Sequence, residues 1–465
     1  MKLPAILQTI SKDLTSHHAK AIVVGGAVRD HWMQRPVKDY DIEVFGLESL
    51  EQLQQILSRY GSVNLVGKSF GILKFTHEGE EYDFSFPRRE SKSGSGHRGF
   101  DVTVDGKMSF EEAARRRDFT INAMGYEIES AAFLDPFGGR SDMVQQQLRH
   151  IDSRTFVEDP LRVYRAVQFA ARFGYTLATE TERLCKEMVD QDMLQELPKE
   201  RIYTEFTKLL LKAPRPSLGF ALIRRLGILR YFPELEEIID LPQEPRWHPE
   251  GDVWTHTMMA LDVMAEILHS RSGCPHPDNQ QKLKFLFAIL CHDLGKATTT
   301  TIESDGRIRS IGHEQAGIPL TQSLLNRLTD EQRLTESILP LAAHHLKPSQ
   351  FYAQGAKAAA IRRLATKVSI ADLVLVAKAD FLGRTTPEAQ TGIYEAGEWL
   401  LTQAQALQVS TTPPTPLLQG RDLIALGLDP SPRFREILDA LYEQQIEGKL
   451  QSQEEALAYV KQHFI

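Results

Sequence analysis

Hydrophobic and polar residues are spaced in two different ways along the chain. Before residue 140 the apolar residues form short runs or alternate with polar ones, which predicts strands at Ala21–Val24, Val63–Val66, Gly71–Phe75 and Tyr82–Phe86. Helical spacing occurs there in residues 1–20, in a short stretch after Gly26 and in Leu50–Tyr60. After the turn Asp135–Gly139 the spacing is helical almost throughout. The pattern therefore predicts a small α+β region followed by helical ones.

Two segments rich in proline and polar residues, Leu241–Asp252 and Val409–Leu418, read as linkers in the helical part. A chain of 465 residues is long enough for two to four domains. We expect four: an α+β N-terminal head with a mixed or antiparallel sheet and helices, then three all-α parts. The boundaries are 1–140, 141–240, 245–390 and 410–465.

The first predicted strand of the head ends at Gly25 and Gly26, and a helical pattern follows. Glycines there would let backbone N–H groups approach a phosphate at a helix N-terminus. The next strand carries Asp39 and Asp41, whose side chains share one face because strand residues i and i+2 point the same way. A glycine turn and a solvated acidic strand would be the simple alternatives.

Two carboxylates held this close suit two Mg²⁺ ions about 3.5–4 Å apart, the arrangement used for in-line phosphoryl displacement. Asp83, on the later strand Tyr82–Phe86, is a candidate third carboxylate for the same site. The polar, basic segment Pro87–Phe100 is expected to be a flexible loop of the kind that closes over a nucleotide, although many such loops have no role.

A helix with acidic residues and a proline in its first turn is predicted to start at Glu158. A carboxylate accepts a hydrogen bond from the exocyclic amine of cytosine or adenine, and an arginine donates to their ring acceptors. Guanine and uracil present the reverse pattern on that edge. Asp159 and Arg162 could thus select C and A without a template; capping acids and a solvated basic face are the alternative.

Histidines concentrate beyond the first linker. His256 lies in a helical stretch, His292-Asp293 ends an apolar helix, and Asp380 lies in a third helical stretch. Imidazole and carboxylate groups converging from separate helices predict a metal site that activates water against phosphoesters. Three further histidines are candidate ligands of a second ion: His313, His344 and His345.

The net charge and the composition argue against several classes of protein. The net charge of −8 argues against a general, charge-driven nucleic-acid binder but allows local basic patches. The longest apolar run, Phe285–Cys291, is too short to span a bilayer, and the N-terminus has no secretory signal pattern. Three distant cysteines fit a reducing compartment, so we expect a cytoplasmic protein that binds no membrane.

Taken together, these segments resemble a class II tRNA nucleotidyltransferase, the bacterial CCA-adding enzyme with a fused HD phosphohydrolase domain. GGAVRD with KDYD resembles the first motif of that family, RRRDFTINAM the second, and EDPLRVYR its amino-acid template for C and A. KERIYTEFTKLL resembles the motif that braces the template helix, and GRDLIALGL a C-terminal segment of many members. The resemblance names the four expected parts as head, neck and body, HD domain and tail.

The resemblance implies a role for each motif residue. Asp39 and Asp41 would bind the catalytic Mg²⁺ ions, and Gly26 and Arg29 would contact the nucleotide phosphates. Arg117 would contact the nucleotide. The recognition site would contain Glu158, Asp159, Arg162 and Arg165.

The implied activity is template-independent addition of CCA to the tRNA 3′ end from CTP and ATP. For the HD part, with its signature on His256, His292, Asp293 and Asp380, the resemblance implies 2′,3′-cyclic phosphodiesterase, 2′-nucleotidase and phosphatase activities. We expect Mg²⁺ in the head and Ni²⁺, Mn²⁺ or Mg²⁺ in the HD domain. The expected partner is tRNA and not DNA, and the chain is a monomer or a homodimer.

Four alternatives remain at this point. A bacterial poly(A) polymerase shares the head motifs, but the segment VGKSFGILKF and the HD part argue against it. A partial enzyme would add only CC or only A. The chain could also be chiefly an HD phosphohydrolase with an RNA-binding head, which the intact Asp39, Asp41 and Arg117 disfavour. The acidic charge disfavours a non-enzymatic RNA-binding module. If the two sites are independent, Asp39→Ala abolishes nucleotide addition and spares hydrolysis.

Overall fold

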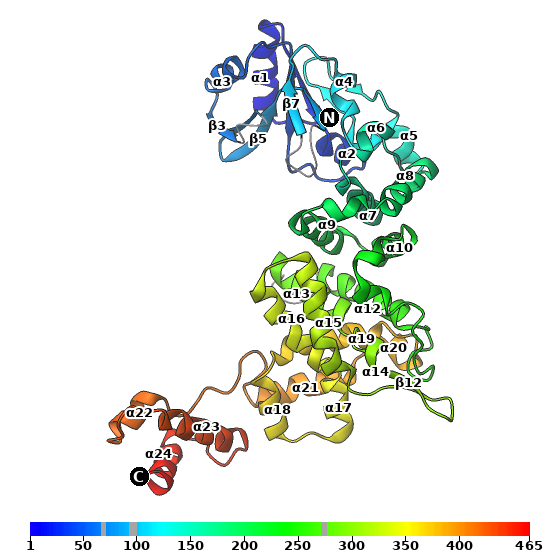
Figure 1. The fold of residues 1–465 in the computed structure, drawn as a ribbon. Coiled ribbons are helices and arrows are strands. Elements are labelled where there is room, and N and C mark those ends of the chain that lie inside the picture. The colour runs from blue at the N-terminus through cyan, green and yellow to red at the C-terminus, as the bar shows by residue number, and fades with distance from the viewer. Residues whose placement is uncertain (67–70, 93–99, 271–276) are drawn as a thin grey trace. The chain divides into compact units, whose positions relative to one another are not determined.

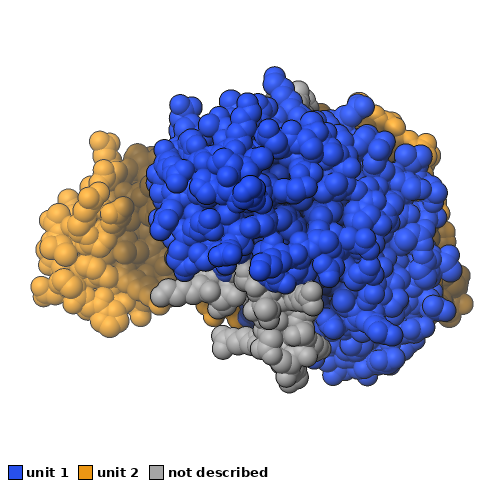
Figure 2. All heavy atoms as spheres, turned by 90° about the horizontal axis from the view of Figure 1, so that it is seen from above, with its two compact units in different colours: residues 1–213, 218–228 blue, residues 214–217, 229–465 orange. Residues whose placement is uncertain are grey.

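The computed structural model describes residues 1–66, 71–92, 100–270 and 277–465. It divides into two compact units, the first of residues 1–213 and 218–228 and the second of residues 214–217 and 229–465 (Figure 2). The predicted head and most of the predicted neck and body lie in the first unit, and the histidine-rich part and the tail lie in the second. In the described parts of the chain, every helix is too short or too polar to cross a bilayer.

The elements up to residue 228 include both helices and strands (Figure 1). They are α1 (Ala5–Ser16), β1 (Lys20–Val24), α2 (Gly26–Trp32), β2 (Asp41–Phe45), α3 (Leu50–Leu57), β3 (Ser62–Val66), β4 (Ile72–His77), β5 (Glu80–Ser85), β6 (Arg88–Lys92), β7 (Phe100–Val104), α4 (Phe110–Arg115), β8 (Gly125–Glu127), β9 (Ala132–Leu134), α5 (Gly139–Val144), β10 (Gln147–Leu148), α6 (Ser153–Val157), α7 (Leu161–Phe173), β11 (Thr176–Leu177), α8 (Thr179–Asp190), α9 (Lys199–Lys212) and α10 (Ser217–Arg225).

The elements after residue 228 are helical except for one short hairpin. They are α11 (Pro233–Glu236), α12 (Val253–His269), α13 (Asn279–Cys291), α14 (Lys296–Thr299), β12 (Thr300–Ile302), β13 (Ile308–Ser310), α15 (His313–Leu328), α16 (Gln332–His344), α17 (Lys347–Gln354), α18 (Ala358–Ala365), α19 (Ile370–Leu382), α20 (Pro387–Gln390), α21 (Glu395–Ala406), α22 (Gly420–Ala425), α23 (Arg433–Ile446) and α24 (Gln453–His463). The predicted fold class, an α+β head followed by helical parts, is confirmed.

A seven-stranded mixed sheet, in the order β3-β4-β5-β2-β1-β8-β9, organises the head. All its neighbouring strands are antiparallel except β2 and β5, which are parallel. The inner strand β1 is buried on both faces, as its continuous apolar run indicates. Ala21 and Val23 pack in the core with α1 and α3, whereas Ile22 and Val24 belong to a second cluster with Met108 of the segment before α4.

Two expectations about the head need correction. Asp39 is not on a strand, because β2 begins at Asp41 and the residues before it have no regular structure. The segment expected as a loop, Pro87–Phe100, contains β6, which pairs with β7 as an antiparallel hairpin. β6 (RRESK) is polar and the centre of the segment is rich in glycine and serine, so the composition did not indicate the pairing. Residues 93–99 lie outside the described residues, as do residues 67–70 of VGKSFGILKF.

Candidate functional site

The predicted carboxylates of the head come together at the end of β1. The sheet register places Asp41 beside Val24, the residue before the Gly25-Gly26 turn, and beside Asp83 on the parallel neighbour β5. Desolvation raises the pKa of Asp41, Arg117 opposes this shift, and Asp83 and Asp39 raise the pKa further. Carboxylates that crowd one another in this way fit a divalent cation, which would remove their repulsion.

Arg117 connects these carboxylates to the glycine turn. Its Nη1 lies 2.8 Å from the position that a Cβ would take on Gly25, whose φ is +70°, so a larger residue would meet both backbone strain and the guanidinium. Arg117 and Arg116 also donate to one carboxylate oxygen of Glu43, over 3.0 and 2.9 Å. Sequence analysis missed Glu43, although its i+2 spacing from Asp41 places both on one face of β2.

Arg29 is not open to solvent in this structure. It is buried, donates to Asp30 and to the side-chain oxygen of Asn122 over 2.6 Å, and Asn122 in turn donates to Asp118 over 3.0 Å. Asp118 accepts from Nε of Arg165 over 2.7 Å. Two of the four predicted nucleotide-binding arginines, Arg29 and Arg165, therefore belong to one hydrogen-bonded chain. To reach a phosphate, Arg29 would exchange one of these partners.

The pair of Asp118 and Arg165 is expected to brace the first unit. Burial alone would raise the pKa of Asp118, but Arg165 and the Asn122 amide lower it below its usual value. We expect Asp118→Asn to lower the free energy of unfolding by about 2–3 kcal/mol, because it leaves the partly buried Arg165 without its counter-charge. Urea unfolding followed by circular dichroism measures the change.

This contribution has a defined pH dependence. Because the folded pKa of Asp118 is lowered, its stabilisation is present above the unfolded pKa of about 3.9 and is lost as the pH falls through the lower folded value. Glu111→Gln, which removes an exposed i,i+4 partner of Arg115, serves as the control and should change little. An Asp118→Asn variant as stable as the wild type would contradict the bracing role.

The predicted base-selecting residues lie where α6 meets α7, but Asp159 and Arg162 do not pair with each other. Asp159 accepts hydrogen bonds from the backbone N–H of Leu161 and, over 3.1 Å, from Nη2 of Arg201. Glu158 is the residue that follows the last turn of α6. Arg162 donates to two backbone carbonyls, those of Thr155 over 2.8 Å and Arg116 over 2.6 Å. Arg201 of α9 thus holds the start of α7.

In the second unit, the predicted metal ligands converge from the ends of separate helices. His256 lies in α12, His292 and Asp293 follow α13, His313 begins α15, and Asp380 lies in α19. Nε2 of His256 is 3.0 Å from Asp380, and Nε2 of His292 is 3.2 Å from Asp293. Nε2 of His313 is 3.2 Å from the other oxygen of Asp293. All five side chains are buried.

Of the adjacent histidines His344 and His345, only His345 belongs to this cluster. Nε2 of His345 lies 3.4 Å from that of His313 and 3.7 Å from Asp293. His344 belongs to none of the groups of described residues that could hold a metal ion. The two residues are consecutive at the end of α16, where neighbours point in directions about 100° apart, so only one can face the cluster.

The histidines are oriented as metal ligands. Nδ1 of His292, His313 and His345 each lies 2.7–2.8 Å from a backbone carbonyl, which must accept, so Nδ1 carries the hydrogen. This bond fixes the ring and leaves the Nε2 lone pair for a cation. Nε2 of His292 is buried and, although it lies 3.2 Å from Asp293, makes no well-aligned hydrogen bond to a described residue. The cluster therefore fits a divalent cation.

Two cations balance the carboxylates of the cluster. Lys296 Nζ lies 2.7 Å from Asp293, and Arg384 Nη2 lies 2.9 Å from Asp380. Burial alone would raise the pKa of Asp293, but His292 and Lys296 hold it well below its usual range. The cluster opens into a pocket of about 200 Å³ whose lining includes Asp293, Lys296 and Arg384. A phosphate entering this pocket would meet both cations.

Sequence analysis missed a supporting group because it lies in the segment expected to be a linker. Glu250 is buried and accepts from Nδ1 of His256 over 2.8 Å and of His248 over 2.9 Å. The backbone N–H of Thr385 donates to its second oxygen. Gln243 of the same segment accepts from Lys296 over 2.6 Å. The proline-rich, polar composition of this segment is typical of a linker, but the segment is ordered and orients the histidine cluster.

Three family models match the chain in order. The poly A polymerase head domain matches residues 21–149, a probable RNA and SrmB-binding site of polymerase A matches 174–239, and the HD domain matches 253–377. The head and HD families are metal-dependent, in agreement with the carboxylate and histidine groups described above.

Relatives and solved structures agree with these models. A multifunctional CCA protein of Methylobacillus flagellatus is 36% identical, covering 79% of this chain and 85% of that protein, and one of Stenotrophomonas maltophilia is 38% identical over 69% and 74%. The fold resembles the Bacillus stearothermophilus CCA-adding enzyme in complex with CTP, with a TM-score of 0.66 and 22% identity over 99% of this chain and 98% of that one.

A Thermotoga maritima CCA-adding enzyme complexed with tRNA shares the fold with a TM-score of 0.60 and 19% identity over 100% of this chain and 97% of that one. The identity to the curated relatives, which extends over most of both chains, confirms the resemblance seen in the sequence. The chain therefore belongs to the family of multifunctional CCA proteins.

Proposed function

We propose that this nucleotidyltransferase adds C, C and A to the 3′ end of tRNA in its head, and hydrolyses phosphoesters of RNA 3′ ends in its histidine cluster. The single observation that carries the first activity is the register that sets Asp41 beside Asp83 and next to the glycine turn. Mg²⁺ held by Asp39 and Asp41 would stabilise the charge that develops on the α-phosphate and on the leaving pyrophosphate.

The arginines of the head supply the remaining phosphate contacts in this proposal. Arg117 lies beside Gly25 and next to Asp41, so its guanidinium is placed to bind a triphosphate lying over the turn. Arg29 would join it by exchanging its bond to Asp30. Because Glu43 holds Arg117 from the buried side, the guanidinium keeps one orientation.

Base selection is proposed for the start of α7. Asp159 and Arg162 would present an acceptor and a donor to the base once each exchanges a present partner, Arg201 for the acid and a backbone carbonyl for the arginine. Arg165 would hold α7 in place through Asp118, with Glu158 completing the turn before the helix.

The histidine cluster is proposed to bind a divalent metal ion, Ni²⁺, Mn²⁺ or Mg²⁺, through His256, His292, Asp293 and Asp380, with His313 and His345 on a second position. A bound cation would supply an activated water. Lys296 and Arg384 line the pocket beside it and would neutralise the phosphate of the substrate. We expect hydrolysis of 2′,3′-cyclic and 2′-phosphates.

One assay separates the candidate activities of the head. A tRNA transcript ending at the discriminator base is incubated with Mg²⁺ and CTP, ATP or both, and product length is read at single-nucleotide resolution. We expect two additions with CTP alone and a third when ATP is present. Arrest after CC, or addition of A only to a transcript ending in CC, would identify a partial enzyme, and a long adenosine ladder a poly(A) polymerase.

A further inference from the structure

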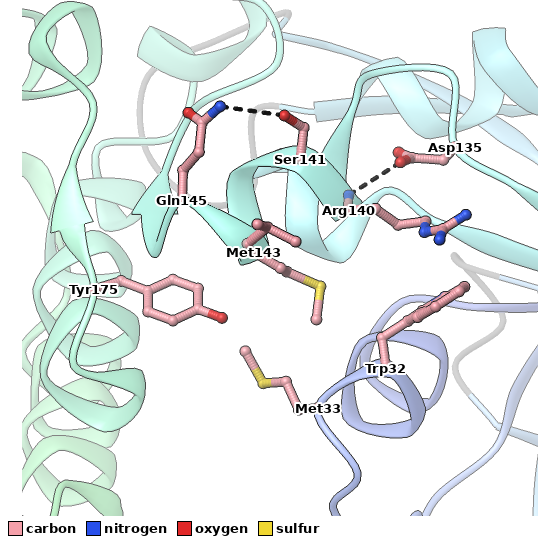
Figure 3. Close-up of a pocket in the computed structure, with 9 residues that line it drawn as sticks. Trp32, Met33, Asp135, Arg140, Ser141, Met143, Gln145 and Tyr175 are labelled. Atoms are coloured by element: carbon pink, nitrogen blue, oxygen red, sulfur yellow. Dashed lines mark hydrogen bonds between the residues drawn. The ribbon is translucent and has the colours of Figure 1, made fainter.

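A second pocket lies in the first unit, beside the C-terminal end of α2. It has a volume of about 640 Å³, which is within the range of small-molecule sites. Figure 3 shows Tyr175, Met33 and Met143 around its hollow, with Trp32 and Arg140 at one end. None of the predicted catalytic carboxylates lines it.

The walls of this pocket suit a flat, polarisable ligand. In Figure 3 the Tyr175 ring points into the hollow towards the thioethers of Met33 and Met143. Arg140 lies over the Trp32 ring, with its guanidinium carbon 3.9 Å from the ring centroid. Aromatic rings and guanidinium planes are the surfaces on which nucleobases stack, with little dependence on which base is present.

A cluster of arginines adjoins the pocket through Phe173, whose ring centroid is 5.8 Å from that of Tyr175. The guanidinium carbons of Arg29, Arg35 and Arg172 lie 4.9, 5.0 and 5.0 Å from the Phe173 centroid. Arg29 pairs with Asp30. Arg35 and Arg172 pair with no carboxylate in the described part of the chain.

The positive charges of this cluster act on one another. Burial lowers the pKa of Arg172 and Arg29 lowers it further; Asp30 opposes this shift and Arg35 adds to it. Arg35 also lies close enough to Tyr175 to act on its pKa, which burial raises and Arg35 and Arg29 lower. An anion placed between Arg35 and Arg172 would relieve the repulsion between the guanidinium groups. The positive charge of this cluster contrasts with the net charge of −8 of the whole chain.

We propose that this region binds one nucleotide of the RNA substrate outside the reacting 3′ end, with its base on Tyr175 and its phosphate between Arg35 and Arg172. The inference rests on the proposed function, since it assumes an RNA substrate. The same chemistry, a phosphate joined to a planar base, is offered by the incoming CTP or ATP. The absence of Asp39, Asp41 and Asp83 from the pocket lining favours the RNA.

The test measures tRNA binding directly, by fluorescence anisotropy without nucleotides, alongside the KM for CTP. We expect Tyr175→Ala to weaken tRNA binding about tenfold and Tyr175→Phe to retain it, because stacking needs the ring and not the hydroxyl. Arg35→Ala should weaken binding and reduce the slope of log K against log salt by about one, the loss of one phosphate contact. The KM for CTP should not change.

Arg59→Ala is the matched control, because Arg59 is an exposed arginine of the head that pairs with Asp13 and lies outside both the pocket and the segment matched by the RNA-binding model. Unchanged tRNA affinity in Tyr175→Ala and Arg35→Ala would overturn the proposal, and so would a raised KM for CTP with unchanged tRNA affinity, which would assign the pocket to the nucleotide. Arg35 is exposed, so its variant tests the proposal even if Tyr175→Ala does not fold. A wild type that binds tRNA but adds no nucleotide would refute the proposed function instead.

Discussion

Asp41→Asn is expected to abolish nucleotide addition while leaving hydrolysis by the histidine cluster intact. The amide keeps the shape of the side chain but cannot bring a negative charge to a divalent cation, and Asp41 is the carboxylate that adjoins Val24, Asp83 and the glycine turn. We expect addition to fall by at least about a thousandfold, or about 4 kcal/mol of transition-state stabilisation. Single-turnover extension of the tRNA transcript with CTP measures it.

The control is Glu48→Gln, which removes an exposed carboxylate of the head outside the site and should leave addition unchanged. Hydrolysis of a 2′,3′-cyclic nucleotide, measured on the same preparations, reports on the second unit. If Asp41→Asn kept its addition rate, Asp41 would not bind the catalytic cation. If both activities were lost, the two sites would not be independent.

The part of the head site that the sequence predicted depends on short-range geometry. The two glycines, the two aspartates and the apolar strand before them are within about one supersecondary unit, so local patterns indicated where Asp41 lies, although the strand begins at Asp41 and does not include Asp39. The position of Asp83 opposite Asp41 depends on β5 pairing in parallel with β2, across the intervening β3 and β4. No local pattern encodes that pairing, and Asp83 was therefore only a candidate.

Networks between distant segments could not be predicted. Asp118 lies in a recognised motif, but nothing near it in sequence indicates that it accepts from Arg165, 47 residues later, and from Asn122. Glu250 was missed for another reason: its segment has the composition of a linker, and only the tertiary structure shows that it orients His256. The composition of a segment indicates its average preference for solvent. It does not indicate whether a given polar side chain has a hydrogen-bond partner in the folded protein.

Asp293→Asn is expected to remove the metal ion and the phosphohydrolase activity together, and to spare nucleotide addition. One oxygen of Asp293 lies 3.2 Å from Nε2 of His313, and the other lies 3.2 Å from Nε2 of His292 and 2.7 Å from Lys296. The carboxylate thus joins both halves of the cluster, and an amide supplies neither its charge nor its second acceptor. We expect hydrolysis of 2′,3′-cyclic nucleotides to fall by about a thousandfold or more.

Metal content distinguishes this explanation from a structural one. Elemental analysis after loading with Ni²⁺ or Mn²⁺ and gel filtration should find bound metal in the wild type and in Asp372→Asn, a control that removes a partly buried ion pair with Lys284 outside the cluster. Asp293→Asn should retain none and should lose the rise in melting temperature that the metal gives the wild type. Because Asp293 bridges groups from α13, α15 and the end of α16, a variant that kept full metal content would show that the histidines alone bind the ion, and Asp293 would then act on the substrate or on Lys296.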